Sequence, residues 1–433
     1  MSLFLLVAVG ISTFCVFKLL RGLLDVNFTP GPRPLFSPIS TFGAVLPSCS
    51  LNPGTQWFWK RRHEGISSLY LKDSRLINCR EYFNRSHDVI AFVPWMIGSP
   101  AYYVSSLDVM KQLLSAENKI HLEKPQDLTL ARLWGHSVTS ANGDVWRRYR
   151  RVVSPAFNNK TYSEVWKTVR SAYQEMMDTE GWTRRNELVF DEINSLVLKF
   201  TFIIICRCGF AFSTPWSATR SETDNFPDAL RLVSETLIPR LVIPNWVYSL
   251  PFERLRGMNR AWQTVASTVT DLIEDKNGLD ELDVVANMFS LMFDLADQSS
   301  LSFTLFCFWE AGRLCPSAAF IPRQLTEDVI IDVVRPRSEV FLKNGNLVMF
   351  DLVGVFCNPD TFQDSDIFRP GRWENVSEHD IGMFGFGPRA CIGRKFSQTE
   401  SLSFLSALLL EWEVEPNMLL GEDKSDYERR VMG

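Results

Sequence analysis

The sequence predicts a mainly α-helical body with small β-sheets, preceded by an N-terminal membrane anchor helix. Three observations predict this class. Helical apolar periodicity dominates from about residue 105 onward. Strand-like stretches are short and scattered, and residues 3–17 form an uncharged apolar run. Helices that cover a small sheet are one of the few arrangements that bury the apolar faces of both kinds of element.

Composition limits the domain count and the class of partner. The chain has 433 residues, of which 46% are hydrophobic, so it is long enough to bury a large core. No Gly/Ser-rich linker, low-complexity tract or repeat marks a boundary after about residue 50, so residues 49–433 are predicted to form a single domain. The net charge of −5, with mostly scattered basic residues, gives no reason to expect nucleic acid as a partner. Nine cysteines without regular spacing argue against a disulfide framework and suit a reducing compartment.

Residues 1–24 are predicted to form a membrane anchor helix. A span needs about 20 apolar residues, a length that this segment reaches if Lys18 extends to the membrane interface. A cleaved signal peptide is the alternative, but the basic residues follow the apolar run instead of preceding it. Lys18, Arg21 and Arg33 on the C-terminal side predict a single-pass protein whose body lies in the cytosol. Residues 25–48 are predicted to be a Pro-rich linker that stops the helix.

The body contains recognisable helical and strand patterns. Helical periodicity covers residues 105–118 and 186–210, and residues 394–412 have the apolar spacing of a long buried helix. Strands are predicted near residues 68–72, 89–93, 101–104, 328–331 and 347–350. The segment FGFGPRACIG, residues 384–393, comes directly before the last helix, so its cysteine is predicted to lie at a helix N-terminus.

This segment combines one thiol with an unusual set of neighbours. A cysteine at a helix N-terminus and near Arg389 has its thiolate favoured by the helix dipole and by positive charge. The glycines at 385, 387 and 393 allow the backbone to approach a flat ligand and permit positive φ. A nucleophilic cysteine is a weaker interpretation, because no histidine lies beside it in sequence and the chain has only five. A simple helix-capping loop is the other alternative, but it would not require this combination of residues.

The same segment resembles the heme-binding signature of the cytochrome P-450 monooxygenases, F-x-x-G-x-R-x-C-x-G. Phe384, Gly387, Arg389, Cys391 and Gly393 carry the pattern. The resemblance implies that Cys391 is the axial thiolate ligand of the iron of heme b. It also implies that Phe384 packs beside the sulfur and that Arg389 meets a heme propionate. Gly393 would let the following helix approach the porphyrin.

Further motifs occur in the order found in that family. Trp146 and Arg150 are similar to its W-x-x-x-R segment, and they lie one helical turn apart, so they share a helix face. The resemblance implies that both reach a propionate. The arginines at 147, 148 and 151 form either an ordinary basic surface or a docking site for an acidic redox partner.

Glu310 and Arg313 match the E-x-x-R motif, and Arg372 in PGRW matches the P-x-R-F region with Trp in place of Phe. The resemblance implies that these three residues form a buried, hydrogen-bonded charge triad that braces the cysteine loop. An isolated E-x-x-R pair is common in helices, so the order of the motifs gives it its value. Arg323 follows E-x-x-R at the spacing where relatives place another propionate-binding arginine.

The oxygen-groove motif of the family has its best counterpart at residues 295–300. The catalytic candidates are Asp297, Gln298 and Ser299, since the family uses an acid and an alcohol there to relay protons. Gln298 cannot release and regain a proton as a carboxyl does. Asp297 substitutes for it if the helix shifts; equally open alternatives are that Asp294 does so or that Asp297 has a structural role. Ser299 precedes Glu310 by only 11 residues, whereas relatives interpose several tens. The chain is therefore expected to be internally shortened near 300–312 and short at its C-terminus.

Taken together, the motifs resemble fungal microsomal members of the family, especially those of basidiomycetes. This implies a heme-thiolate monooxygenase of the endoplasmic reticulum membrane that acts on O₂ and a small apolar substrate, such as a terpenoid secondary metabolite or a foreign aromatic. Electrons would come from NADPH through a separate reductase, because the chain has no nucleotide-binding glycine loop and no iron–sulfur cysteine cluster. The alternative is a catalytically impaired remnant that persists as a membrane-attached heme-binding or interaction protein.

Overall fold

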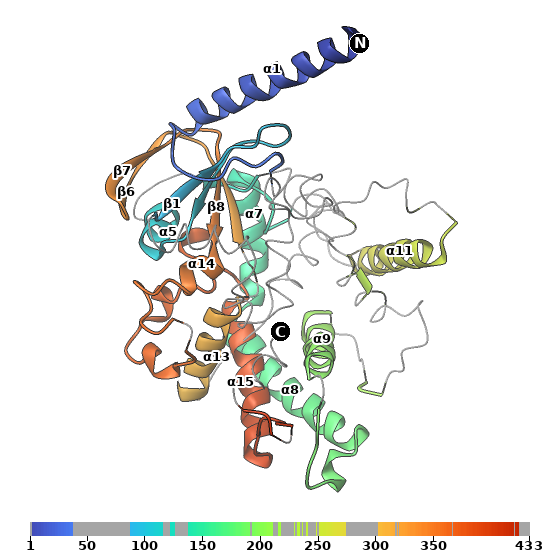
Figure 1. Cartoon of the computed structure of the whole chain (residues 1–433). Coiled ribbons are helices and arrows are strands. Elements are labelled where there is room, and N and C mark those ends of the chain that lie inside the picture. The colour runs from blue at the N-terminus through green and yellow to red at the C-terminus, as the bar shows by residue number, and fades with distance from the viewer. Residues whose placement is uncertain are drawn as a thin grey trace. The chain divides into compact units, whose positions relative to one another are not determined.

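Figure 1 shows the computed structural model of the chain. Its residues form two compact units. The first comprises Met1–Pro125, Phe306–Ala390 and Met418–Gly433, and the second comprises Gln126–Leu305 and Cys391–Asn417. The structure describes residues 2–37, 87–115, 122–125, 137–190, 193–210, 215–217, 251–273, 302–316, 318, 320–365, 367–419 and 421–423, with single positions at 229, 232, 233, 236, 240 and 248.

A five-stranded sheet forms the centre of the first unit, in the order β1-β2-β8-β5-β3. Its strands are β1 (Val89–Phe92), β2 (Ala101–Val104), β3 (Leu122–Glu123), β5 (Phe320–Leu325) and β8 (Leu347–Asp351). β2 pairs with β8 in parallel, and the other neighbours are antiparallel. Of these strands, β1, β2 and β8 are rich in apolar β-branched and aromatic residues, which suit a pleated surface. One face of the sheet buries the cluster Ile90, Phe92, Ala101, Tyr103 and Met349.

A two-stranded hairpin in the same unit consists of β6 (Val329–Val334) and β7 (Arg337–Leu342). Buried and exposed residues alternate along β6, as expected where one face of a strand packs inward. The strands predicted near residues 89–93, 101–104, 328–331 and 347–350 correspond to β1, β2, β6 and β8. The strand expected near residues 68–72 lies outside the described residues.

Helix α1 (Ser2–Asp25) is, among the described helices, the one long and apolar enough to cross a membrane. The Pro-rich segment after it runs beside residues 91–97. The N–H groups of Ala91, Val93 and Trp95 donate to carbonyls at 30, 32 and 34 over 2.8, 3.3 and 2.9 Å. Those carbonyls belong to prolines, which have no N–H of their own but still accept hydrogen bonds. The segment is therefore bonded to the first unit through residue 37.

The C-terminal end of α1 is itself packed on the first unit. Gly22 lies so close to Val93 that a Cβ on Gly22 would meet Val93 Cγ1 at 2.5 Å. Lys343 Nζ lies 2.8 Å from Asp25 Oδ1, and Asn346 Nδ2 donates to the carbonyl of Asp25 over 2.7 Å. The end of the helix is thus fixed by close packing and by polar contacts together.

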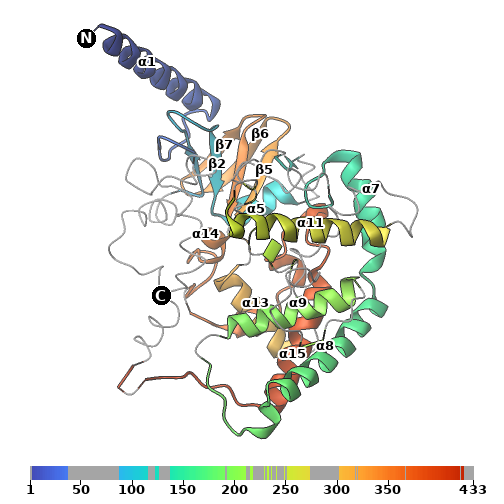
Figure 2. The same ribbon diagram turned by 90° about the vertical axis from the view of Figure 1, so that its right-hand side faces the viewer.

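The second unit is helical where the structure describes it (Figure 2). Helix α8 packs against both α9 and α15. The buried cluster between these helices includes Val165, Val169, Met176, Phe200, Ile204 and Phe396. The helices of this unit are α7 (Gly143–Val153), α8 (Asn159–Thr179), α9 (Asn194–Phe210), α11 (Glu253–Ile273) and α15 (Arg394–Glu411).

The predicted fold class, mainly α with small sheets, is confirmed. The helix predicted over residues 105–118 is α5 (Leu107–Leu114) of the first unit, and Ser106 caps it by accepting from the N–H of Val109. The helix predicted over 186–210 begins only at Asn194. Two further elements of the first unit support the candidate site: α13 (Ser302–Leu314), from Phe306 onward, and α14 (Leu352–Phe356).

Candidate functional site

The cysteine loop, residues 382–390 directly before Cys391, depends on glycines for its backbone conformation. Gly382, Gly385 and Gly387 have φ values of 74°, 75° and 68°, in the left-handed region that favours glycine. The N–H of Gly385 donates to the carbonyl of Gly382 over 2.9 Å, and the N–H of Ala390 donates to the carbonyl of Gly387 over 3.0 Å. Residues 382–390 therefore form two successive tight turns, and a side chain at either of the first two glycines would strain the first of them.

Two helices of the first unit support this loop. On α13, the ring of Phe308 stacks on Phe384 with 6.4 Å between centroids and 18° between planes. Gly312 of α13 lies against Met383, and a Cβ on Gly312 would meet Met383 Sδ at 1.9 Å. On α5, Lys111 Nζ lies 5.7 Å from the centroid of the buried Phe386 ring. The position of the loop therefore depends on where α13 and α5 lie.

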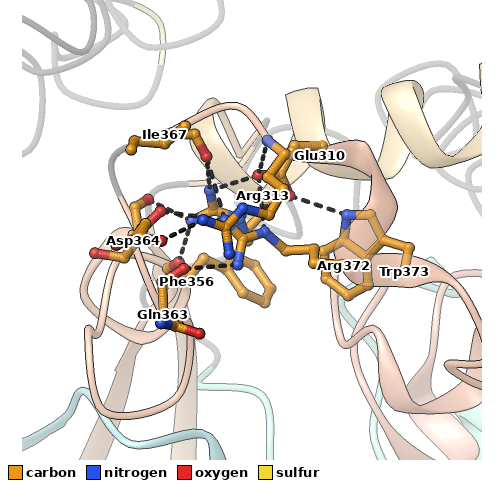
Figure 3. Close-up of polar contacts among 10 residues, drawn as sticks. Glu310, Arg313, Phe356, Gln363, Asp364, Ile367, Arg372 and Trp373 are labelled. Atoms are coloured by element: carbon orange, nitrogen blue, oxygen red, sulfur yellow. Dashed lines mark hydrogen bonds and ion pairs between the residues drawn. The ribbon is translucent and has the colours of Figure 1, made fainter.

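A buried ion cluster surrounds Glu310 of α13 (Figure 3). Glu310 is 0% exposed and Arg313 is 1% exposed. Arg313 donates to both carboxylate oxygens, from Nη2 to Oε1 over 2.8 Å and from Nε to Oε2 over 2.9 Å. Arg372 Nε donates to Oε1 over 2.9 Å, and the N–H of Arg369 donates to the same oxygen over 2.9 Å. Bidentate, charge-assisted bonds of this kind fix both distance and orientation.

The arginines of this cluster also hold the backbone of the segment before residue 373. Arg313 Nη1 donates to the carbonyl of Phe356 over 2.7 Å, at the end of α14. Arg372 donates to the carbonyls of Gln363 and Asp364 over 2.9 and 3.1 Å. Burial alone would raise the pKa of Glu310, but the hydrogen bonds from Arg313, Arg369 and Arg372 outweigh burial and hold this pKa below its usual range.

Arg323 on β5 lies in an environment that calls for an anion. Its side chain is 7% exposed, and Nη1 donates to the carbonyl of Pro322 over 2.8 Å. Burial, and after it the charge of Arg389, lowers the pKa of Arg323 to about 10. Among the residues that the structure describes, no carboxylate forms an ion pair with Arg323. Because a buried guanidinium beside a second one is costly without a counter-charge, the two arginines suit an anionic group.

In the second unit, Cys391 is a half-buried cysteine outside any disulfide, two residues before the N-cap of α15. Gly393 is that N-cap, and its carbonyl accepts from the N–H of Ser397 over 3.0 Å. The φ of Gly393 is −77°, so this glycine does not use the positive φ that Gly385 and Gly387 adopt. The first N–H groups of α15 have no partner within the helix, which places the positive end of the helix dipole next to the cysteine.

Trp146 and Arg150 both lie on α7, one turn apart. Trp146 packs against the buried cluster formed by Val138, Ala141 and Tyr149, and Arg150 is half-buried. The side chains of the arginines at 147, 148 and 151 are exposed, and Arg147 forms an ion pair with Asp144 of the same helix. The helix therefore presents both a partly buried and a strongly basic face.

The predicted distal residues Asp297, Gln298 and Ser299 lie outside the described residues. The structure resumes at α13, which runs without a break from Ser302 through Glu310 to Leu314.

Comparison with known proteins identifies the family. The family model "Cytochrome P-450" matches residues 74–279 and 279–432, which is most of the chain, so this protein belongs to the cytochrome P-450 family. Members of this family bind heme through a cysteine thiolate and act as monooxygenases. The family to which the sequence motifs pointed is thereby confirmed.

Individual relatives have low sequence identity to this chain but match most of its length. A cytochrome P-450 monooxygenase 124 of Postia placenta is 20% identical over 414 residues, covering 78% of this chain and 80% of the relative. A cytochrome P-450 monooxygenase of Arthrobotrys oligospora is also 20% identical, covering 76% and 77%. A crystal structure of a cytochrome P-450 (CYP102L1) matches with a TM-score of 0.60 and 19% identity, over 79% of this chain and 92% of that one. This structural likeness supports the fold.

The residues present fit a heme. In the second unit, a cysteine outside any disulfide near the start of α15 offers one soft ligand. In the first unit, the guanidinium groups of Arg323 and Arg389 are of the kind that binds carboxylates such as those of a porphyrin. Within the described residues, no group of three or more His, Cys, Asp or Glu side chains could hold a bare metal ion. Sequence reasoning missed the contact between Gly312 and Met383 and the bond from Arg369 N–H, because neither leaves a pattern in the sequence. Trp373 in PGRW did leave a signal in the sequence, because it adds an N–H donor at a position where the family has Phe.

Proposed function

We propose that this protein is a heme-thiolate monooxygenase that inserts one oxygen atom from O₂ into a small apolar organic substrate. The observation that carries the proposal is the position of Cys391, a cysteine outside any disulfide, two residues before the N-cap of α15 and directly after the glycine-containing turns of residues 382–390. When bound, heme b supplies the activation of O₂, which a thiolate ligand promotes by donating electron density. The chain itself must hold the heme, keep the sulfur ionised and deliver protons.

Each of these tasks has candidate residues. Cys391 holds the iron, and the helix dipole at the start of α15 favours its thiolate form. Phe384, Gly387 and Gly393 shape the loop against the porphyrin. Trp146, Arg150, Arg323 and Arg389 bind the propionates. The support for the last assignment is that Arg323 is buried beside the positive charge of Arg389, an arrangement that a bound anion would stabilise.

Proton delivery is assigned from sequence to Ser299 with Gln298 and Asp297. A hydroxyl such as that of Ser299 both donates and accepts hydrogen bonds, and Asp297 supplies the ionisable group that Gln298 lacks. These residues would hold and move protons on the oxygen side of the heme.

The proposed membrane attachment and redox partner of the enzyme are inferred from α1 and α7. We propose a single-pass attachment to the endoplasmic reticulum membrane by α1, with the body in the cytosol. Electrons would come from NADPH through a separate reductase, and the exposed arginines 147, 148 and 151 of α7 are suited to an acidic partner. Because relatives include fungal monooxygenases, a terpenoid-type secondary metabolite or a foreign apolar compound is the proposed substrate class.

The test is the absorption spectrum of the reduced protein with carbon monoxide. The wild-type chain is expected to show the Soret band typical of thiolate ligation, and Cys391→Ala is expected to abolish it. Cys315→Ala is the matched control, because Cys315 is likewise outside any disulfide but is exposed, and its replacement is expected to leave the band unchanged. A thiolate band that survives in the Cys391 variant would exclude this residue as the ligand.

A second candidate function is a catalytically impaired remnant that keeps a heme-binding or membrane-attached role. The observation that favours it is the unbroken course of α13 through Phe308 to Glu310, where relatives are expected to have further chain. The family model also matches in two segments that meet at residue 279. Reading the transcript across the codons for 308–310 separates the two, because an extra in-frame segment there would restore a full-length catalytic domain.

A further inference from the structure

Trp373 takes part in the Glu310 cluster as a hydrogen-bond donor. The side chain is 3% exposed, and its Nε1 donates to Glu310 Oε2 over 3.0 Å (Figure 3). This is the fifth hydrogen bond to one carboxylate, after two from Arg313 and one each from Arg369 and Arg372. A phenylalanine at this position has no donor to offer.

We infer that Trp373 is a positioning residue for the cysteine loop, because its indole N–H fixes the carboxylate of Glu310 and with it the face of α13 that supports the loop. The role of that loop in presenting Cys391 to heme rests on the proposed function above. The positioning itself rests on the contacts of the first unit alone.

The Trp373 contact fixes one oxygen of the carboxylate. Oε1 has three donors, whereas Oε2 has the Nε of Arg313 and the indole of Trp373. Without the indole N–H, Oε2 keeps a single donor, and a buried carboxylate oxygen that loses a partner is poorly compensated. The carboxylate is then less firmly held in the plane that Arg313 requires for its bidentate bonds.

Ring contacts extend the same connection to the loop. The ring of Trp373 lies edge-to-face with that of Trp309 on α13, at 6.3 Å between centroids and 78° between planes. The residues on either side of Glu310 on this helix carry the loop contacts, since Phe308 stacks on Phe384 and Gly312 abuts Met383. A small rotation of α13 would therefore move the surface against which Met383 and Phe384 pack. The connection runs through packed, contiguous groups and not through a solvent-filled space.

The experiment compares Trp373→Phe with Trp309→Phe in the full-length, heme-loaded protein. Both variants remove an indole N–H from a buried ring, but the N–H of Trp309 has no hydrogen-bond partner within the described residues. The first readout is amide hydrogen exchange of residues 381–390. The second is the fraction of the reduced carbon monoxide complex that shows the thiolate Soret band.

Trp373→Phe is expected to speed exchange in residues 381–390 by roughly tenfold to a hundredfold, the factor that corresponds to a lost hydrogen bond to a charged group. Part of its carbon monoxide complex is expected to move away from the thiolate band. Trp309→Phe keeps an aromatic ring against that of Trp373 and loses no hydrogen bond to Glu310, so it is expected to change both readouts much less than Trp373→Phe. Equal exchange in Trp373→Phe and wild type overturns the inference, as does equal acceleration in both variants.

Trp373→His tests the donor separately, because histidine keeps a ring N–H. It is expected to restore slow exchange, or to restore folding if Trp373→Phe is insoluble, and failure of this rescue overturns the donor role. A wild-type protein with no thiolate band would contradict the proposed function. The exchange comparison would still decide the positioning role in that case.

Discussion

Glu310 and Glu400 are two buried glutamates in opposite electrostatic environments. Hydrogen bonds from Arg313, Arg369 and Arg372 hold the pKa of Glu310 below its usual range despite burial. Within the part of the chain that the structure describes, Glu400 on α15 has no arginine partner of this kind: burial raises its pKa to about 8, and a polar contact with Thr201 offsets only part of this rise. The first glutamate is therefore a charged structural centre, and the second is held as a neutral acid at neutral pH.

The state of Glu400 predicts how stability changes with pH. A glutamate in an unfolded chain has a pKa of about 4.3, so between that pH and about 8 the folded protein binds a proton that the unfolded chain releases. Stability from this group therefore falls as pH rises through that window, by about 1.4 kcal/mol per pH unit at most. Glu400→Gln cannot ionise, so we expect it to be more stable than wild type near pH 8 and its stability to depend less on pH.

Urea unfolding of wild type and variant at several pH values within that window measures this difference. Glu164→Gln is the matched control, because Glu164 is an exposed residue of α8 whose pKa is lowered by its hydrogen bond to Lys167. It is expected to leave the pH dependence nearly as in wild type. Parallel pH profiles for Glu400→Gln and wild type would show that Glu400 is ionised in the folded protein at neutral pH.

Sequence could predict some residues of the site and not others, for a physical reason. The spacing of Glu310 and Arg313 is readable because both lie on one helix turn, and Cys391 is readable because its neighbours are consecutive. The bond from Trp373 to Glu310 joins positions 63 apart, and the approach of Arg323 to Arg389 depends on how β5 enters the sheet. Such contacts are set by tertiary packing, which leaves no periodic trace.

At the scale of elements, strands that alternate or carry dense apolar residues were predictable, and the others were not. β1, β2, β6 and β8 are rich in valine, isoleucine and aromatic residues. β7 reads RSEVFL and is largely exposed. β5 contains Pro322, which normally argues against a strand. It also contains Arg323, and a charged residue gives no hint from its hydropathy that it will be buried. Pairing with β8 on one side and β3 on the other overrides these local preferences.

The docking of α1 was also beyond sequence reasoning. An apolar run predicts a helix of membrane-spanning length, but it does not show which end packs on the body. In the structure the ammonium of Lys18, which we expected at the membrane interface, donates to the carbonyl of Met96. With Gly22 against Val93 and Asp25 bonded to Lys343, the last turns of the helix belong to the packed unit.

We therefore predict that Gly22→Val undocks the end of α1. The new side chain would have to occupy space held by Val93 Cγ1, only 2.5 Å from the ideal Cβ position, so either the helix or residue 93 must move. Amide hydrogen exchange of residues 89–97 in detergent is expected to become faster. Gly10→Val is the matched control on the same helix, because nothing lies within 4 Å of a Cβ there. Equal exchange in both variants would mean that the packing at Gly22 does not hold the helix.

At the scale of the whole molecule, the described structure includes the loop that leads to Cys391, whereas the residues proposed for the oxygen side of the heme are known only from the sequence. The supports of the loop before Cys391 are present in the described structure: the buried Glu310 cluster, the glycine turns and the half-buried contacts of α13. The proton-relay candidates are assigned from sequence alone, and there Gln298 stands where the family carries an acid. Heme binding and turnover are therefore separable properties of this chain.

This separation predicts a protein that binds heme with thiolate ligation but converts NADPH oxidation into product inefficiently. Product formed per NADPH consumed, measured with a reductase and a panel of apolar compounds, is expected to rise on Gln298→Glu, since the variant supplies the missing carboxyl. General acid–base groups contribute about 10²-fold or more to rate, so a restored relay should be readily visible. Asp297→Asn serves as the comparison, because a loss of turnover in that variant would show that Asp297 already supplies the proton. If Gln298→Glu changes nothing while the thiolate band is intact, the identity of residue 298 is not the limiting defect, and the shortening that the sequence predicts near residues 300–312 becomes the next one to test.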